Sequence, residues 1–188
     1  MTMRHPDRVL RRLNRPVLIW RITLLATGFL LAITVSGLLG FRVNLTPSEP
    51  LGLWRIIPLD RSVMVGDIVF ICPPATPIMR EARSRGYLRD GLCLSGMAPL
   101  IKAVLAVGGQ TVDICDEVRI DGEPIANSRV MREDAKGRPL VPYAGGVLPS
   151  RTVFVHSAFP GSFDSRYFGP LPLSNVLGLA RKVWTYAP

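Results

Sequence analysis

The stretch Ile22–Phe41, ITLLATGFLLAITVSGLLGF, contains no charged side chain. Twenty residues in an α-helix rise about 30 Å, which matches the hydrocarbon thickness of a bilayer. The stretch therefore predicts a transmembrane helix that anchors the chain. A cleaved signal peptide is the alternative, because Ser36, Gly37 and Gly40 supply small residues, but the apolar part of a signal peptide usually has only about 7 to 15 residues.

Residues 1–21 form a basic arm before this stretch. They contain one acidic residue, Asp7, and six arginines: Arg4, Arg8, Arg11, Arg12, Arg15 and Arg21. Basic residues beside a membrane span tend to stay in the cytoplasm, so we expect residues 42–188 to lie on the other side of the membrane. The arm supplies more than half of the formal net charge of +9. The other basic residues are dispersed, which argues against a nucleic-acid partner.

After Phe41 the apolar runs become short, and glycine-rich turns separate them. Six runs have the length and the composition of strands: residues 67–71, 100–107, 111–114, 118–120, 152–156 and 176–184. Gly108-Gly109 and Asp121-Gly122 are examples of the turns between them. The pattern predicts a single, mainly β, antiparallel domain over residues 42–188, with room for one short helix over residues 78–89.

Three cysteines, Cys72, Cys93 and Cys115, lie in the part that we place in an oxidising compartment, so at most one intramolecular pair can form. A bridge between Cys72 and Cys93 would close a loop of about 20 residues and stabilise the fold by roughly 3 kcal/mol. Three small buried thiols are the alternative. We expect residues 72–99 to be an insertion in the β domain. The cysteines lack the spacing of metal ligands, so no metal site is expected.

Lys102 lies in a strongly apolar stretch, residues 98–104. Burial there lowers the pKa of a lysine amine, which can then act as a general base. A lysine on an edge strand that extends its amine into water is the alternative. His156 is the only histidine in residues 42–188, and it lies within an apparent strand. The sequence therefore does not favour a Ser-His-Asp triad.

Two polar segments could complete a site around this lysine. Ser48 follows the apolar stretch within a few residues, so its hydroxyl would lie close to the bilayer surface, where a membrane-bound substrate could reach it. A simple turn residue is the alternative reading of this serine. Residues 161–169, GSFDSRYFG, gather hydroxyls, a carboxylate and a guanidinium, and Asp164 and Arg166 can pair there to fix a tight loop.

Three motifs occur in the following order along the chain. The first, Asn-x-Thr-x-Ser-x-Pro-x-Gly-Leu, is met by Asn44, Thr46, Ser48, Pro50, Gly52 and Leu53. The second joins Cys-Pro-Pro (72–74), Gly-Tyr-Leu (86–88), Gly-x-Cys (91–93) and Pro-Leu-x-Lys (99–102). The third is Ser-x-Asp-Ser-Arg-Tyr-x-Gly (162–169). Together they resemble the Ser/Lys signal peptidases, most closely their conjugative-transfer branch, the TraF-type peptidases.

The resemblance implies a signal peptidase I or LexA-like antiparallel β domain with serine endopeptidase activity and no cofactor. Ser48 corresponds to the nucleophile and Lys102 to the general base of a Ser/Lys dyad, a known variant of the catalytic triad. The resemblance also implies three supporting roles. Thr46 corresponds to a side-chain donor of the oxyanion hole, and Ser162 to a hydroxyl that orients the lysine amine. Asp164 and Arg166 correspond to a charged pair that holds the loop.

The resemblance further implies a location in the bacterial inner membrane with the catalytic domain in the periplasm. The implied substrate is an exported, membrane-embedded pro-pilin, which is cyclised after cleavage in some members of the branch. Mating-pair-formation proteins are further expected partners. Two alternatives stay open: a general type I leader peptidase for secretory precursors, and a non-catalytic periplasmic assembly protein of a transfer or secretion complex, in which Ser48 and Lys102 are incidental.

Overall fold

The computed structural model describes residues 15–187. The chain divides into two units, one up to Leu39 and one from Gly40 onward, and each is described by itself. The second unit is called the body below. Most of the expected basic arm, residues 1–14, lies outside the described residues.

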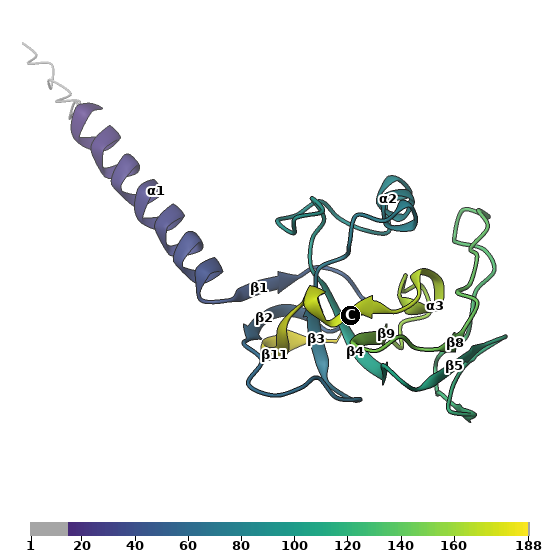
Figure 1. The fold of residues 1–188 in the computed structure, drawn as a ribbon. Coiled ribbons are helices and arrows are strands. Elements are labelled where there is room, and N and C mark those ends of the chain that lie inside the picture. The colour runs from purple at the N-terminus through teal and green to yellow at the C-terminus, as the bar shows by residue number, and fades with distance from the viewer. Residues whose placement is uncertain (1–14, 188) are drawn as a thin grey trace, which may run out of the picture. The chain divides into compact units, whose positions relative to one another are not determined.

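Helix α1 (Arg15–Leu38) forms the first unit (Figure 1). Its residues Val17–Leu38 have a mean hydropathy of 2.0 and exposed side chains, so the helix is long and apolar enough to cross a bilayer. A signal sequence can have the same length and composition. Thr23 and Thr34 donate their hydroxyl protons to carbonyl oxygens four residues earlier, at 3.0 and 2.9 Å. These hydroxyls are therefore satisfied inside the helix, as an apolar environment requires.

The ends of α1 differ from the predicted helix at residues 22–41. The helix begins seven residues earlier, at Arg15, because Val17 to Trp20 are also apolar and one arginine does not interrupt a helix. It ends earlier because Gly40 has a φ of 86°, which turns the chain into the first strand, and a Cβ there would lie 2.9 Å from the carbonyl oxygen of Ile56.

The large sheet has seven strands in the order β1-β2-β11-β3-β4-β9-β10, and all neighbouring pairs are antiparallel. The strands are β1 (Phe41–Asn44), β2 (Leu51–Ile57), β3 (Ile68–Ile71), β4 (Leu100–Val107), β9 (Thr152–His156), β10 (Leu171–Pro172) and β11 (Val176–Tyr186). Strand β11 pairs with both β2 and β3 and so joins the β1–β2 hairpin to the rest of the sheet. Gly52 allows this close pairing, because a Cβ there would lie 2.3 Å from the carbonyl oxygen of Trp184.

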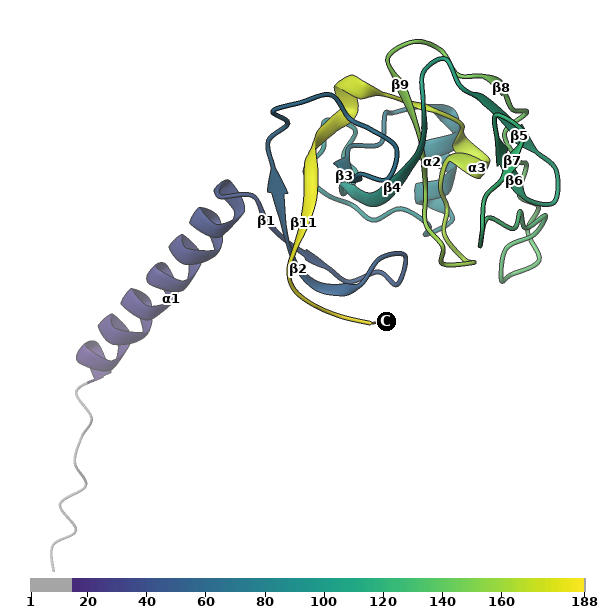
Figure 2. The same ribbon diagram turned by 90° about the horizontal axis from the view of Figure 1, so that it is seen from below.

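A small sheet has four strands in the order β7-β6-β5-β8. They are β5 (Thr111–Ile114), β6 (Val118–Ile120), β7 (Glu123–Pro124) and β8 (Gly146–Val147). Figures 1 and 2 show this sheet at the end of the body opposite to β1, β2 and β11. The predicted fold class, a mainly β domain with antiparallel pairing after one apolar N-terminal helix, is confirmed.

Helix α2 (Pro77–Ser84) lies in the segment between β3 and β4. Thr76 caps its first turn by accepting a hydrogen bond from the N–H of Met79, and Pro77 fits the first helical position. The prediction of a helix at residues 78–89 is therefore wrong for the second half of that range, because the helix ends at Ser84. Gly86, with a φ of 84°, ends the helix in a turn where the N–H of Tyr87 bonds the carbonyl of Ala82.

Two further short helices, α3 (Ser165–Phe168) and a 3₁₀ turn (Leu173–Asn175), follow β9. The main core lies between the large sheet and the segment that carries α2 (Figure 1). Its buried members are Val63, Val69, Ile71, Met79, Ala82, Leu88, Met97, Val104, Val153, Val155 and Leu171. Because Met79, Leu88 and Met97 belong to residues 72–99, this segment contributes to the main core and is packed into the body.

Candidate active site

Ser48 lies in the loop between β1 and β2, and one buried amide organises this loop. The side-chain Nδ2 of Asn44 donates to the carbonyl oxygens of Thr46, Glu49 and Pro50 at 2.9, 2.8 and 3.1 Å. Its Oδ1 accepts from the N–H and from the hydroxyl of Thr46 at 3.1 and 2.8 Å. The conformation around Ser48 is therefore set by contacts within the protein.

The polar groups of Ser48 have different surroundings. Its Oγ lies 3.5 Å from Oγ1 of Thr46. Its carbonyl oxygen accepts a hydrogen bond from the hydroxyl of Ser157, which is buried at the end of β9. Within residues 15–187, its main-chain N–H donates to no other residue. This N–H can therefore bind an oxyanion.

Lys102 lies on β4 and is only 3% exposed. Its Nζ donates a hydrogen bond to Oγ of Ser162 at 2.7 Å. Burial lowers the pKa of Lys102 to about 8, and the positive charge of Arg166 acts in the same direction, whereas the negative charges of Asp164 and Glu49 oppose the shift. An appreciable fraction of this amine is neutral near neutral pH, as a general base requires.

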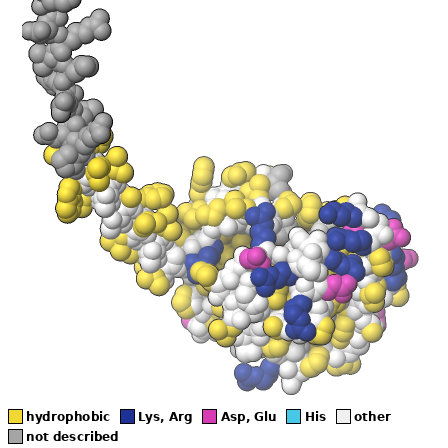
Figure 3. Space-filling view, turned by 90° about the horizontal axis from the view of Figure 1, so that it is seen from above, with side chains coloured by type: hydrophobic (Ala, Val, Ile, Leu, Met, Phe, Trp, Pro, Cys, Tyr) yellow, Lys and Arg dark blue, Asp and Glu magenta, His cyan; other side chains and the backbone are white. Residues whose placement is uncertain are grey.

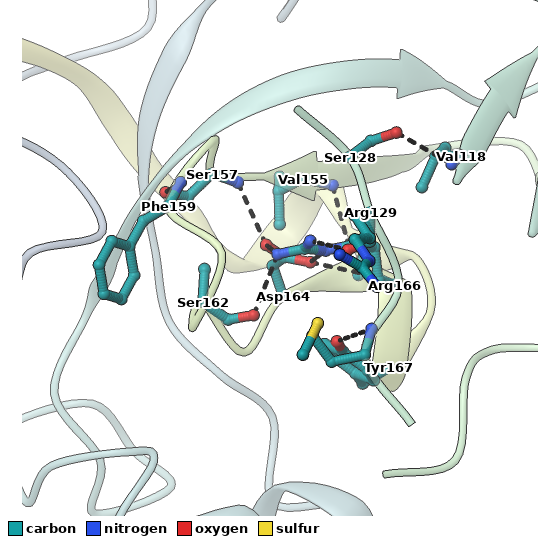
Figure 4. A network of polar contacts seen from close by, with 12 residues as sticks. Val118, Ser128, Arg129, Val155, Ser157, Phe159, Ser162, Asp164, Arg166 and Tyr167 are labelled. Carbon is teal, nitrogen blue, oxygen red and sulfur yellow. Dashed lines mark hydrogen bonds and ion pairs between the residues drawn. The ribbon is translucent and has the colours of Figure 1, made fainter. Parts of the chain in front are cut away.

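Asp164 and Arg166 form a fully buried ion pair next to Ser162 (Figure 4). The two contacts join Nε to Oδ1 at 2.8 Å and Nη2 to Oδ2 at 2.9 Å, so the pair is bidentate. The guanidinium also donates to the carbonyl oxygens of Ser162 and Arg129, at 3.1 and 2.6 Å. Asp164 accepts from the N–H of Ser157 at 3.2 Å. The pair thus fixes the main chain on both sides of the Ser162 hydroxyl.

The predicted site residues form two groups from separate parts of the chain. Lys102 contacts Ser162, whose loop is held by Asp164 and Arg166, and Thr46 lies beside Ser48. Among the described residues, Lys102 Nζ and Ser48 Oγ make no hydrogen bond with each other.

Three residues near the site received no role from the sequence. Asn44 was part of a motif, and a short polar side chain at the end of a strand is a usable signal for a loop-organising role. Ser157 had no distinguishing signal, and the third residue is Glu49.

Burial raises the pKa of Glu49, while the charges of Lys102 and Lys182 act against this shift. The carboxyl group next to Ser48 is therefore close enough to Lys102 for each to affect the other.

His156 pairs with Ala103 across β4 and β9 and is 4% exposed. Burial lowers its pKa to about 4, so its imidazole is neutral in the pH range in which Lys102 loses its proton. Its Nε2 has no hydrogen-bond partner among the described residues. A neutral imidazole at this place adds no positive charge that would lower the pKa of Lys102 further.

Cys72 and Cys93 are joined by a disulfide, with their Cα atoms 5.7 Å apart, and Cys115 is free and exposed. The bridge closes the segment that carries α2. The ring of Tyr87 in this segment lies 5.1 Å from the ring of Phe163, which follows Ser162 directly. The segment therefore contacts the loop that holds the lysine. In residues 15–187, no three His, Cys, Asp or Glu side chains are grouped as metal ligands would be.

The chain is similar to known proteins over most of its length. Residues 16–185 match the family described as signal peptidase, peptidase S26. The chain is 54% identical to a probable conjugal transfer protein TraF of Sinorhizobium fredii over 180 residues, which cover 95% of this chain and 94% of the relative. It is 33% identical to a plasmid transfer protein TraF of Escherichia coli over 188 residues, 96% of this chain and 99% of the relative.

Among solved structures, a signal peptidase I from Enterococcus faecalis V583 resembles the chain with a TM-score of 0.39 and 20% identity, covering 63% of this chain and 97% of that one. The family match extends from α1 to β11, and so includes all the segments that form the candidate site. The chain therefore belongs to the signal peptidase family, peptidase S26.

Proposed function

We propose that this protein is a membrane-anchored serine endopeptidase that cleaves the pro-pilin of a conjugative plasmid transfer system. Ser48 is the nucleophile and Lys102 the general base. The observation that carries the proposal is the environment of Lys102: a buried amine with a pKa of about 8, which bonds Ser162 and is affected by the charge of Glu49, the residue after Ser48. A lysine extended into water, the alternative for this residue, would be exposed.

In the proposed mechanism, Oγ of Ser48 attacks the scissile carbonyl carbon while neutral Lys102 accepts its proton. Lys102 then returns the proton to the leaving amine, so one residue acts as base and later as acid. The acyl-enzyme is released by water or by an amine of the substrate. Lys102 Nζ bonds Ser162 in the structure, so it has to approach Ser48 Oγ for the reaction. Catalytic hydrogen bonds often tighten only when substrate is bound.

The oxyanion would be held by the free N–H of Ser48, with the hydroxyl of Thr46 as second donor. Thr46 Oγ1 lies 3.5 Å from Ser48 Oγ, but its hydroxyl bonds Oδ1 of Asn44 in the structure. Thr46 therefore has to turn its hydroxyl proton from Asn44 to the oxyanion during the reaction. Loss of one such donor typically lowers kcat by about 100-fold to 1000-fold.

Helix α1 is proposed to anchor the protein in the inner membrane, with the body in the periplasm. The apolar length of Val17–Leu38 supports the anchor, and the arginines of residues 1–21 support the orientation. The disulfide between Cys72 and Cys93 suits an oxidising compartment. Anchoring enzyme and membrane-embedded substrate in one bilayer raises their effective concentration.

The relatives named for conjugal and plasmid transfer support a pilin substrate over the many precursors of a general leader peptidase. Mating-pair-formation proteins are proposed as further partners on the same grounds. The segment 72–99, with its disulfide and its contact to Phe163, is packed beside the candidate site and can shape which substrate enters.

The test is mass spectrometry of the pro-pilin co-expressed with the wild-type chain, with Ser48→Ala or with Lys102→Arg, at equal membrane abundance. Only wild type is expected to trim the substrate, because arginine cannot give up its proton at physiological pH. A product lighter by one water than the linear product indicates cyclisation. Trimming by both variants would refute the dyad and favour a non-catalytic assembly role. Rescue of a strain depleted of its leader peptidase would favour the general enzyme.

A further inference from the structure

The segment between β3 and β4 ends in a loop whose backbone is fixed. We call residues 90–97 the Cys93 loop. Asp90 and Met97 form an antiparallel bridge, and the N–H of Gly91 bonds the carbonyl of Gly96 at 3.0 Å. The N–H of Cys93 bonds the carbonyl of Met97 at 3.0 Å, and the disulfide ties this cysteine to Cys72. The side chains of the loop therefore point in defined directions.

Two leucines of the Cys93 loop point away from the body. The exposed fraction is 98% for Leu92 and 111% for Leu94, so both side chains are fully exposed, whereas Cys93 between them is 8% exposed. These are the two highest exposed fractions among the large hydrophobic side chains of residues 17–187. The disulfide and the backbone hydrogen bonds of this loop thus hold two apolar side chains in water, which is unfavourable unless a partner covers them.

Basic residues precede this apolar tip in the sequence. The residues just before it carry four arginines: Arg80, Arg83, Arg85 and Arg89. The neighbouring acids Glu81 and Asp90 pair with Arg85 and Arg83. Arg80 and Arg89 have no ion pair among the described residues. Figure 3 shows the face of the body on the side of α2, with basic side chains spread over it and fewer acidic ones between them.

An apolar tip beside unpaired arginines matches the surface of an anionic bilayer, whose phosphates bind guanidinium groups and whose acyl chains accept leucine. The chain itself brings such a surface close. Only two residues separate the end of α1 at Leu38 from the start of β1 at Phe41, so the body cannot move far from a membrane that α1 crosses. With so short a tether even a weak second contact is occupied, because its effective concentration is high.

We infer that the Cys93 loop is a second membrane contact, in which Leu92 and Leu94 insert among the acyl chains and Arg89 binds lipid phosphate. The disulfide fixes the position of Cys93, which lies between the two leucines in the sequence. The contact would fix the orientation of the body on the bilayer, and it does not depend on whether the protein is a peptidase.

The test places a photoreactive benzophenone amino acid at position 94 of the full chain carrying Ser48→Ala, in vesicles of phosphatidylethanolamine and phosphatidylglycerol. Leu94 has no packing to lose, so the probe leaves the fold intact. The matched control carries the probe at position 147, because Val147 is 67% exposed on the small sheet. We expect at least about tenfold more lipid adduct at 94 than at 147 by mass spectrometry, as insertion requires.

Equal adduct at both positions, or an adduct of position 94 with polypeptide in place of lipid, would overturn the inference. Arg89→Gln tests the charge. It is expected to lower the yield at 94 severalfold in these vesicles and to leave it unchanged in vesicles of phosphatidylcholine alone. Because Ser48→Ala removes the proposed nucleophile, a positive result stands even if the proposed peptidase activity is refuted.

Discussion

The hydroxyl of Ser157 donates a hydrogen bond to the main-chain carbonyl of Ser48, a residue 109 positions earlier in the sequence. The same hydroxyl accepts from the N–H of Phe159 at 3.2 Å, and the N–H of Ser157 donates to Asp164. Ser157 therefore connects the loop of the proposed nucleophile to the buried ion pair behind Ser162. It touches no reacting atom in the proposed mechanism, and we regard it as a positioning residue.

Replacing Ser157 with alanine should lower kcat about tenfold to 100-fold and change KM little, because small misplacements of a reacting group are costly while substrate contacts persist. Ser157→Thr keeps the hydroxyl and should restore part of the rate. Steady-state kinetics on a pro-pilin peptide measure both constants. Ser174→Ala, at an exposed serine, is the control. A parallel rise in KM with unchanged kcat would contradict a positioning role.

The pH dependence of cleavage should follow Lys102. Its neutral form is the base, so kcat/KM should rise about tenfold per pH unit on the acid side and level off above a pKa of about 8. Stability follows the same group: its pKa in the folded chain lies below the ordinary value of 10.5, so the unfolding free energy should increase as pH rises from about 8 to 10.5. A flat kcat/KM profile between pH 6 and pH 8 would exclude Lys102 as the base.

Glu49→Gln should move the acid limb of this profile to lower pH. The carboxylate of Glu49 raises the pKa of Lys102, so its removal lowers that pKa further. The variant should therefore be more active than wild type at the acid end of the range and equal to it on the plateau. Lys182→Gln is the control, because Lys182 interacts with Glu49 and is not among the causes of the Lys102 shift. A shift toward higher pH in Glu49→Gln would reverse the sign of this interaction.

Asp164→Asn should destabilise the body strongly. Breaking a fully buried ion pair leaves Arg166 charged and uncompensated, which typically costs about 3 to 5 kcal/mol. Urea unfolding followed by circular dichroism of the full chain in detergent measures the loss. Asp90→Asn interrupts an exposed pair with Arg83 and should have little effect. Equal small losses in both variants would show that burial of the pair contributes nothing.

Thiol labelling should distinguish Cys115 from the bridged pair. In the native, non-reduced chain one thiol should react, because Cys115 alone is free and exposed. After unfolding with a reductant, all three cysteines should react. Replacing both Cys72 and Cys93 with alanine should lower the unfolding free energy by roughly 3 kcal/mol, as for a loop of about 20 residues. Three reactive thiols without reductant would refute the bridge.

The strands could be predicted where a run of apolar residues is bounded by turns. The run at 100–107 coincides with β4, and the run at 152–156 coincides with β9. Strands β1 and β2 were not predicted, because Phe41 was assigned to the membrane helix and Leu51–Ile57 lies close behind a proline-rich loop. Gly40 decides this boundary through its backbone conformation, which hydropathy does not report.

The candidate site could be predicted as a set of residues but not as a geometry. The motifs pointed to Ser48, Lys102 and the loop of Ser162 without showing how they contact each other. The bond from Lys102 to Ser162 spans 60 residues, and the bond from Ser157 to Ser48 spans still more. Such contacts depend on strand order, in particular on β11 between β2 and β3, which local sequence does not encode.

This strand order has a consequence for synthesis of the protein. The hairpin that carries Ser48 reaches the strands that carry Lys102 and the Ser162 loop through β11, which the ribosome makes after all of them. While a nascent chain lacks β11, the two halves of the site have no common sheet to bring them into register. The proposed dyad of Ser48 and Lys102 should therefore assemble only after translation has passed Tyr186, and an unfinished chain should lack the proposed peptidase activity.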